Sequence, residues 1–328
     1  MTELLRAGSH ILSGFNLNVF SNDELAELHR AALDVLNEAG LMVLDNEAQE
    51  ILYSHGCRVN KKGDIVKIPP YLVDEAVTSA PSKILLASRN AKHDVFLECN
   101  RVAYSNFGTA PRILDLDTGK TRESTNRDLA ESAILIDACD CVDVHLQPMT
   151  PRDVPYQIAD LVAAETAFLN TTKHFTHDEL ISADGVKRYY EMCVAVAGGV
   201  EEMERRPVGS VATCAIAPLQ LGKDTCQVIM ESAKLGVPCD IVSEPLAGAT
   251  APITIAGLLI LQQAEVLGGI VLSQCTKKGA PVMYGSTAQT LDMSSGNALV
   301  GDPEYGMINA ALAKIAQYYG IPSYIGGT

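Results

Sequence analysis

From about residue 141 to the last residue, short apolar segments alternate regularly with longer segments of helical periodicity. Apolar residues such as Met307, Ala310 and Ile315 recur on one helical face after Asp302-Pro303, an N-terminal signal. Six short segments read as strands: residues 142–148, 173–176, 208–215, 237–243, 280–286 and 322–326. Their spacing of roughly 29 to 43 residues suits β-α-β crossovers. The pattern therefore predicts an α/β protein with a parallel sheet.

Six such strands fit either an open doubly wound sheet, complete at that number, or a (β/α)8 barrel that lacks two strands. No Gly-x-Gly-x-x-Gly follows the first strand, so the usual dinucleotide-binding turn is missing. Polar residues also stand at or beyond the carboxyl end of nearly every strand, where barrel enzymes place their chemistry. We therefore predict the first six strands of a (β/α)8 TIM barrel over residues 141–328, incomplete at the C-terminus.

Residues 1–140 lack this regular alternation and are predicted to form an N-terminal α+β cap. Ser21 and Glu24 have the spacing of a capping box at the start of a helix that Gly40 ends. A hairpin is expected over residues 58–68, and Pro69-Pro70 opens the next helix.

Composition and charge narrow the class of protein. The formal net charge of -15 argues against a nucleic-acid partner and fits a small cationic substrate or ordinary solubility. The nine cysteines include no Cys-x-x-Cys, so neither a disulfide framework nor a metal site is expected. The longest apolar stretch, residues 253–275, contains Gln262, Gln263 and Glu265 and is predicted to be a buried helix, not a membrane span. No signal-peptide core is recognisable near the N-terminus, so a cytoplasmic location is expected.

Several long strings of the sequence resemble the trimethylamine methyltransferase (MttB) family. They are SEPLAGATAPITIAG at residues 243–257, QAEVLGGIVL at 263–272, GAPVMYG at 279–285 and NFGTAP at 106–111. Because these strings are spread along the chain, the resemblance extends over essentially its whole length.

The resemblance implies a (β/α)8 barrel that moves a methyl group from trimethylamine to the cobalt of a corrinoid (cobalamin), in methylamine-dependent methanogenesis. The corrinoid is carried by a cognate partner protein, so no cofactor is bound directly. In family members that use trimethylamine, an amber codon encodes pyrrolysine after a strand resembling residues 322–328. Pyrrolysine is therefore expected immediately after Thr328, and residues 1–328 alone are expected to be inactive.

Among the residues present, Glu244 after the fourth strand is the expected catalytic carboxylate, able to balance an ammonium charge or exchange a proton. Tyr104, Tyr284 and Tyr324 are expected substrate contacts, because aromatic rings attract methylated cations. His174 and Gln220 are expected to bind substrate through hydrogen bonds. For each of these residues a purely structural role remains an alternative, and the capping of the next helix is the alternative for Glu244.

Two other functions remain open at this point. The chain can belong to a pyrrolysine-free methyltransferase for a quaternary amine such as a betaine, which a sense codon after Thr328 would support. It can also be a non-catalytic protein that binds methylated amines, which a soluble, ligand-binding product of residues 1–328 would support. Its apolar helices are also compatible with a homo-oligomer.

Overall fold

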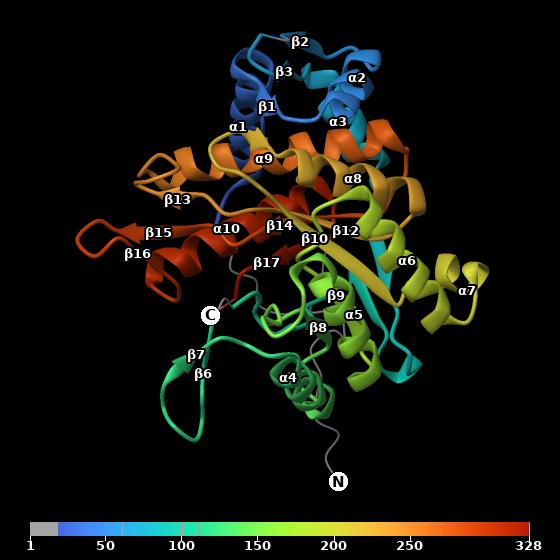
Figure 1. The fold of residues 1–328 in the computed structure, drawn as a ribbon. Coiled ribbons are helices and arrows are strands. Elements are labelled where there is room, and N and C mark those ends of the chain that lie inside the picture. The colour runs from blue at the N-terminus through green and yellow to red at the C-terminus, as the bar shows by residue number, and fades with distance from the viewer. Residues whose placement is uncertain (1–18, 61, 99–100, 111, 328) are drawn as a thin grey trace. The chain divides into compact units, whose positions relative to one another are not determined.

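Six parallel strands appear where the sequence predicts them. The computed structural model describes residues 19–60, 62–98, 101–110 and 112–327 (Figure 1). The six strands are β8 (Val144–Leu146), β9 (His174–His177), β10 (Gly209–Ala215), β12 (Cys239–Ser243), β14 (Val282–Ser286) and β17 (Ser323–Ile325). The pairs β8 with β9, β9 with β10, β12 with β14 and β14 with β17 are parallel. The predicted α/β class with a parallel strand arrangement is confirmed.

Helices occupy the intervals between these strands. They are α5 (Ala159–Asn170), α6 (Ala183–Ala197), α7 (Val200–Arg205), α8 (Lys223–Leu235), α9 (Ile255–Thr276) and α10 (Pro303–Tyr319). Asp302 caps α10 by accepting a hydrogen bond from the Tyr305 backbone N–H, with Pro303 in the first turn, as the sequence predicts. Each strand and its following helix thus form the expected repeating unit.

The chain divides into two compact units, and the boundary falls within β10. Among the described residues, unit 1 contains residues from 84 to 212, whereas unit 2 contains residues from 19 to 83 and from 213 to 327. Three of the six parallel strands, β12, β14 and β17, therefore belong to the same unit as the N-terminal helices. The predicted functional division into a cap over residues 1–140 and a barrel over 141–328 stays a prediction.

In unit 1, the core forms where α5 and α6 cover one face of β8 and β9. Phe175 of β9 packs edge-on against Phe168 of α5 and against Tyr189 of α6, with ring centroids 5.6 and 6.3 Å apart. The Tyr189 hydroxyl also donates to the Phe175 carbonyl, at 3.0 Å, so the buried phenol has a partner. Two short strand pairs, β4 (Lys83–Leu86) with β5 (Val95–Glu98) and β6 (Ile113–Leu114) with β7 (Thr121–Arg122), complete this part of the fold.

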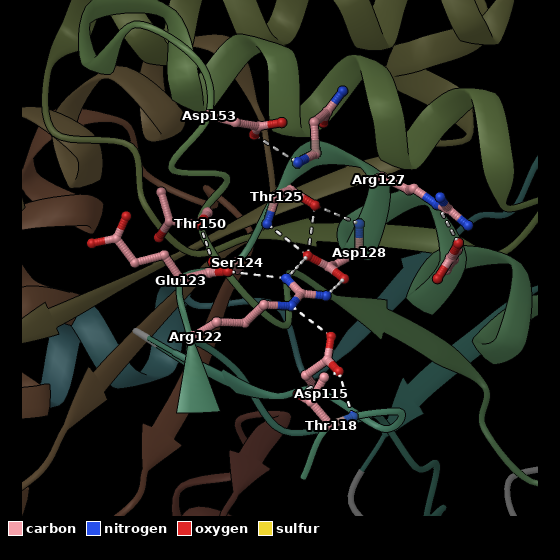
Figure 2. Close-up of polar contacts among 12 residues, drawn as sticks. Asp115, Thr118, Arg122, Glu123, Ser124, Thr125, Arg127, Asp128, Thr150 and Asp153 are labelled. Carbon is pink, nitrogen blue, oxygen red and sulfur yellow. Dashed lines mark hydrogen bonds and ion pairs between the residues drawn. The ribbon is translucent and has the colours of Figure 1, made fainter. Parts of the chain in front are cut away.

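The β6–β7 hairpin is joined to helix α4 (Asn126–Ala138) by Arg122, as Figure 2 shows. The guanidinium donates two hydrogen bonds of 2.8 Å to the Asp128 carboxylate and one of 2.9 Å to Asp115. Asp128 is also the partner of Thr125 in the capping box that starts α4. One arginine therefore links the hairpin turn to the helix N-terminus.

Unit 2 begins with the predicted helix α1 (Asn22–Asp34), which continues as the π-helical turn Val35–Ala39. Ser21 and Glu24 form the expected capping box, and Gly40 ends the helix with φ +82°, a conformation that favours glycine. The predicted hairpin is β2 (Arg58–Asn60) with β3 (Ile65–Lys67), and Pro70 opens α3 (Pro70–Ser79). Strand β1 (Leu41–Val43), helix α2 (Asn46–Ser54) and strand β11 (Gln220–Leu221) complete this region, with β1 pairing both β3 and β11.

Helix α9 is the buried centre of unit 2, as the sequence predicts. Helices α1, α3 and α8 and strands β12 and β14 contact it. Its Gly268 lies so close to Leu41 of β1 that a Cβ at that position would overlap the leucine side chain. Within the described ranges, α9 alone has the length and apolarity to cross a membrane, but 78% of its most apolar stretch is buried. It reads as a core helix of the α/β fold.

Three short strands were not expected from the sequence: β13 (Leu246–Ala247), β15 (Gln289–Asp292) and β16 (Asn297–Leu299). They form a small sheet in the connections that follow β12 and β14. Strand β15 matters for the site below because its first residue, Gln289, contacts Glu244.

Candidate active site

The two faces of β12 differ in what they contact. Ile241 and Ser243 face helix α9, where the Ser243 hydroxyl donates to the Glu265 carboxylate. Side chains alternate along a strand, so Asp240, Val242 and the following Glu244 belong to the opposite face. The side chains of this face point away from α9. Glu244 directly follows the carboxyl end of β12, and parallel α/β folds carry their chemistry at that end of the strands.

Glu244 is held in place by the segment that follows β14. The Gln289 side-chain amide donates a hydrogen bond of 2.6 Å to Oε1 of the Glu244 carboxylate, and Thr287 bonds the same side chain. Glu244 remains exposed, so a ligand can reach it. Neighbouring protein atoms nevertheless displace part of the water around the carboxylate, and this desolvation raises the pKa of Glu244. The hydrogen bonds from Gln289 and Thr287 lower the pKa and only partly oppose this effect. The group is thus a fixed, accessible carboxylate whose proton affinity is increased.

Helix α10 lies beside this carboxylate and brings two buried polar side chains with it. Tyr305 and Asn309 are 1% and 3% exposed, and Glu244 contributes to a raised pKa of Tyr305, although burial is the main cause. Among the described residues, the Tyr305 hydroxyl, Oδ1 of Asn309 and Oε1 of Gln289 have no hydrogen-bond partner. Buried polar atoms normally have partners, so these three exceptions mark Gln289 and the start of α10 as candidate parts of the site.

Of the predicted substrate tyrosines, Tyr324 lies on the same face of the sheet as Glu244. Tyr324 of β17 is paired in register with Gly285 of β14, and a Cβ at Gly285 would lie 2.6 Å from Oδ1 of Asp240 and 2.8 Å from Cα of Val242. Register neighbours share a face, so Tyr324 belongs to the face of Asp240 and Glu244.

Tyr284 lies on the opposite face. It is fully buried, and its hydroxyl donates to Oε1 of Gln262 on α9 at 2.5 Å. Burial raises the pKa of the Tyr284 phenol well above its usual range. The residue therefore links β14 to the central helix, and its ring faces away from Glu244.

Gln220 belongs to a different sheet of unit 2. It lies in β11, which pairs with β1, and it directly follows a turn at Ile216–Leu219. Its side chain is half-buried. The Leu219 N–H donates to Glu265 of α9 at 2.7 Å, so this turn is fixed to the core helix. Burial raises the pKa of Glu265, as it does for Glu244.

In unit 1, His174 and Tyr104 both lie at the amino ends of strands. His174 is the first residue of β9 and is fully buried; its ring nitrogens bond the Ala87 carbonyl and the Ser210 hydroxyl, each at 2.9 Å. Burial lowers the pKa of His174 to about 4, so the imidazole is neutral at pH 7. Tyr104 is 56% exposed and accepts backbone hydrogen bonds from Asp143 and Val144, where β8 begins.

The carboxyl ends of β8 and β9 instead gather polar residues around Glu179, which was not anticipated from the sequence. The Glu179 carboxylate accepts hydrogen bonds from Gln147 at 2.7 Å and from Thr150. Its backbone N–H donates to Nδ1 of His177, while Nε2 of His177 donates to the Asp160 carbonyl. The neutral His177 ring thus fixes the backbone of Glu179. Glu179 follows the end of the predicted strand, residue 176, by three residues, and this position was the available signal.

Gln289, Thr287, Tyr305 and Asn309 were also missed from the sequence. Thr287 and Gln289 follow a strand end by one and three residues, so proximity to the carboxyl edge would have indicated them. Tyr305 and Asn309 carried no such signal, because they read as one apolar and one polar position of a helix. Within the part of the chain that the structure describes, no three His, Cys, Asp or Glu side chains are grouped as metal ligands.

A family model for trimethylamine methyltransferase (MTTB) matches residues 8–328. The chain belongs to the trimethylamine methyltransferase (MTTB) family. It is 43% identical over 330 residues to the trimethylamine methyltransferase MttB of Desulfitobacterium hafniense, which covers 100% of this chain and 66% of that relative. It is 41% identical over 327 residues to MttB of Methanosarcina barkeri, again 66% of the relative. Glycine betaine methyltransferase of Desulfitobacterium hafniense is 31% identical over 316 residues and 64% of its length.

This family member also has the fold of a solved methylamine enzyme. The crystal structure of the Methanosarcina barkeri monomethylamine methyltransferase (MtmB) matches 92% of this chain and 60% of that chain, with a TM-score of 0.59 and 14% identity. At this identity the likeness concerns fold alone, and it agrees with the predicted barrel class. The chain spans just under two thirds of the length of the MttB relatives that it matches.

Proposed function

We propose that the protein transfers a methyl group from trimethylamine to a corrinoid carried by a cognate partner protein. The observation that carries this proposal is Glu244, a fixed and accessible carboxylate at the carboxyl end of β12 in a trimethylamine methyltransferase family member. The higher identity to the MttB relatives than to the betaine enzyme, 43% against 31%, supports trimethylamine as the substrate.

Each part of the site has a chemical role in this proposal. The negative charge of Glu244 attracts a methylated ammonium, and its raised pKa brings proton exchange with an amine closer to neutral pH. Gln289 and Thr287 hold the carboxylate in one orientation, so the Glu244 side chain does not have to reorient when the substrate binds. Tyr324 offers a ring on the same face for contact with methyl groups. When bound, the corrinoid supplies a cobalt centre that accepts the methyl group.

We propose further that pyrrolysine follows Thr328 in the full-length protein and that residues 1–328 alone are inactive. Family membership supports this view. The codon after Thr328 and the mass of the peptide spanning it test it directly. A UAG codon read as pyrrolysine supports the proposal, whereas a standard amino acid at this position contradicts it.

The remaining expectations concern location, metabolic setting, substrate contacts and domains. We propose a cytoplasmic location and the setting of methylamine-dependent methanogenesis, with support from the relatives in Methanosarcina. The acidic net charge of -15 supports a small cationic substrate over nucleic acid. Tyr104, Tyr284, His174 and Gln220 stay predictions as substrate contacts, and the cap over residues 1–140 stays a prediction as a domain.

A pyrrolysine-free betaine methyltransferase is the second candidate, favoured by the 31% identity to the glycine betaine enzyme. The test is methylation of the purified corrinoid protein by the full-length protein, with trimethylamine and glycine betaine compared at equal concentration. We expect methylation with trimethylamine and none above background with glycine betaine. The reverse preference would establish the second candidate, and transfer from neither would contradict both.

A further inference from the structure

Gly326 follows β17 and lies against the first turn of helix α10. A Cβ at position 326 would overlap the Tyr305 hydroxyl and would lie 3.1 Å from Cζ of the same ring and 3.5 Å from Oδ1 of Asn309. The backbone of Gly326 is itself fixed, because its N–H donates to the Ser286 carbonyl at 2.7 Å. The Tyr305 ring therefore sits directly against the backbone that leaves β17.

This contact gives a specific reason for glycine at position 326. Gly326 is not among the glycines with positive φ, so its backbone does not itself demand glycine. Its ideal Cβ meets only Tyr305 and Asn309 among its three nearest atoms. Tyr305 is 1% exposed, so its ring is enclosed by protein and does not lie against open solvent. The size of residue 326 is thus limited by one side chain.

The polar ends of Tyr305 and Asn309 are not explained by packing. Nδ2 of Asn309 donates to the carbonyls of Ala288 and Tyr305, at 3.1 and 2.9 Å, which fixes the orientation of the amide. Its Oδ1 is left facing the region of Gly326 without a partner, as is the Tyr305 hydroxyl. A tyrosine whose hydroxyl makes no hydrogen bond gains nothing over phenylalanine in stability, and its presence needs another reason.

We propose that Tyr305 is a positioning residue that sets where the backbone leaving β17 passes Glu244. The proposal rests on the proposed function, in which Glu244 acts in methyl transfer and pyrrolysine follows Thr328. The Tyr305 ring contacts the Gly326 backbone. The same ring is close enough to Glu244 for an electrostatic interaction between the two side chains. Tyr305 therefore keeps the carboxylate and the Gly326-Gly327 segment at a fixed separation, with Asn309 supporting the contact from one helical turn away.

The test is a size-compensation cycle in the full-length protein, using Gly326→Ala, Tyr305→Phe and the double variant. Gly326→Ala is expected to lower kcat for methyl transfer from trimethylamine roughly 100-fold, with KM changed much less, because a displacement of about 1 Å is enough. Tyr305→Phe removes the overlapping oxygen, so the double variant is expected to recover most of the lost kcat. Gly306→Ala is the matched control, because a Cβ there meets nothing within 4 Å, and it should leave kcat unchanged.

Thermal unfolding of wild type, Gly326→Ala, Tyr305→Phe and the double variant gives a second, activity-independent measurement. Tyr305→Phe should also rescue any loss of Tm caused by Gly326→Ala. The proposal is overturned if Gly326→Ala retains wild-type kcat, or if the double variant is no more active and no more stable than Gly326→Ala. A wild type that methylates no corrinoid while the Tm values show the rescue would overturn the proposed function and leave the contact supported.

Discussion

Three histidines in unit 1 show how differently the same side chain can be accommodated in a core. His174 and His177 use both ring nitrogens in hydrogen bonds, whereas His145 in the middle of β8 has both nitrogens without a partner among the described residues. His145 is fully buried and packs against Phe175, with ring centroids 5.3 Å apart. Its imidazole loses water without replacing the hydrogen bonds, which costs stability.

Replacing His145 with leucine should therefore stabilise the protein. We expect His145→Leu to raise the free energy of unfolding by about 1 kcal/mol, because an unpaired polar ring is exchanged for an apolar side chain of similar volume. His174→Leu is the matched control and should lower the free energy of unfolding, since it leaves the Ala87 carbonyl and the Ser210 hydroxyl short of a partner. Urea unfolding measures both. A His145→Leu variant less stable than wild type would contradict the interpretation.

The same histidines predict how stability depends on pH. Burial lowers the pKa of His145, His174 and His177 to about 4 in the folded chain, below the ordinary value of 6.5. Between these values the unfolded chain binds protons that the folded chain does not, so stability falls as the pH falls from 6.5 towards 4. Each histidine contributes up to about 1.4 kcal/mol per pH unit. Unfolding measured from pH 7 to 5 should show a shallower slope in His145→Leu; an unchanged slope would count against burial of this ring.

At the scale of elements, local sequence signals predicted the helix ends correctly where individual residues determine the backbone conformation. The capping box at Ser21 and Glu24, the positive φ of Gly40 and the proline that opens α3 were all read correctly. Strands β13, β15 and β16 were not, because their two to four residues are stabilised by pairing with each other and carry little periodicity of their own.

The β6–β7 hairpin is an element whose stability should depend on a single side chain. Arg122 binds Asp128 and Asp115, and it holds the pKa of Asp115 at about 2 and that of Asp128 well below its usual range. We expect Arg122→Ala to increase amide hydrogen exchange in the hairpin and the first turn of α4, because their shared anchor is removed.

Arg127→Ala is the control for this prediction. Arg127 is 85% exposed and pairs with Glu131, four residues further along α4. Such surface pairs contribute little. Exchange in the hairpin should therefore stay near the wild-type rate in Arg127→Ala. Equal exchange in both variants would mean that Arg122 does not anchor the hairpin.

At the scale of the whole molecule, the alternation of strands and helices predicted the fold class, because each parallel strand must be followed by a crossover. The predicted site residues stay predictions, because the structure shows only where each of them lies. Glu244 and Tyr324 lie on one face of the sheet. Tyr284 and His174 are buried and bond Gln262, the Ala87 carbonyl and the Ser210 hydroxyl. Strand-end position indicates a candidate residue, whereas the face that it occupies depends on register and packing, which a single sequence does not reveal.

The central claim is that the Glu244 carboxylate acts in methyl transfer from trimethylamine. The most direct measurement is the rate of corrinoid methylation by full-length wild type, Glu244→Gln and Glu165→Gln, the last changing an exposed glutamate of α5 in the same way. Glu244→Gln should lower kcat at least about 100-fold, because the charge and the exchangeable proton are lost while the shape is kept. Glu165→Gln should match wild type. A Glu244→Gln variant that transfers methyl groups at the wild-type rate would contradict the claim.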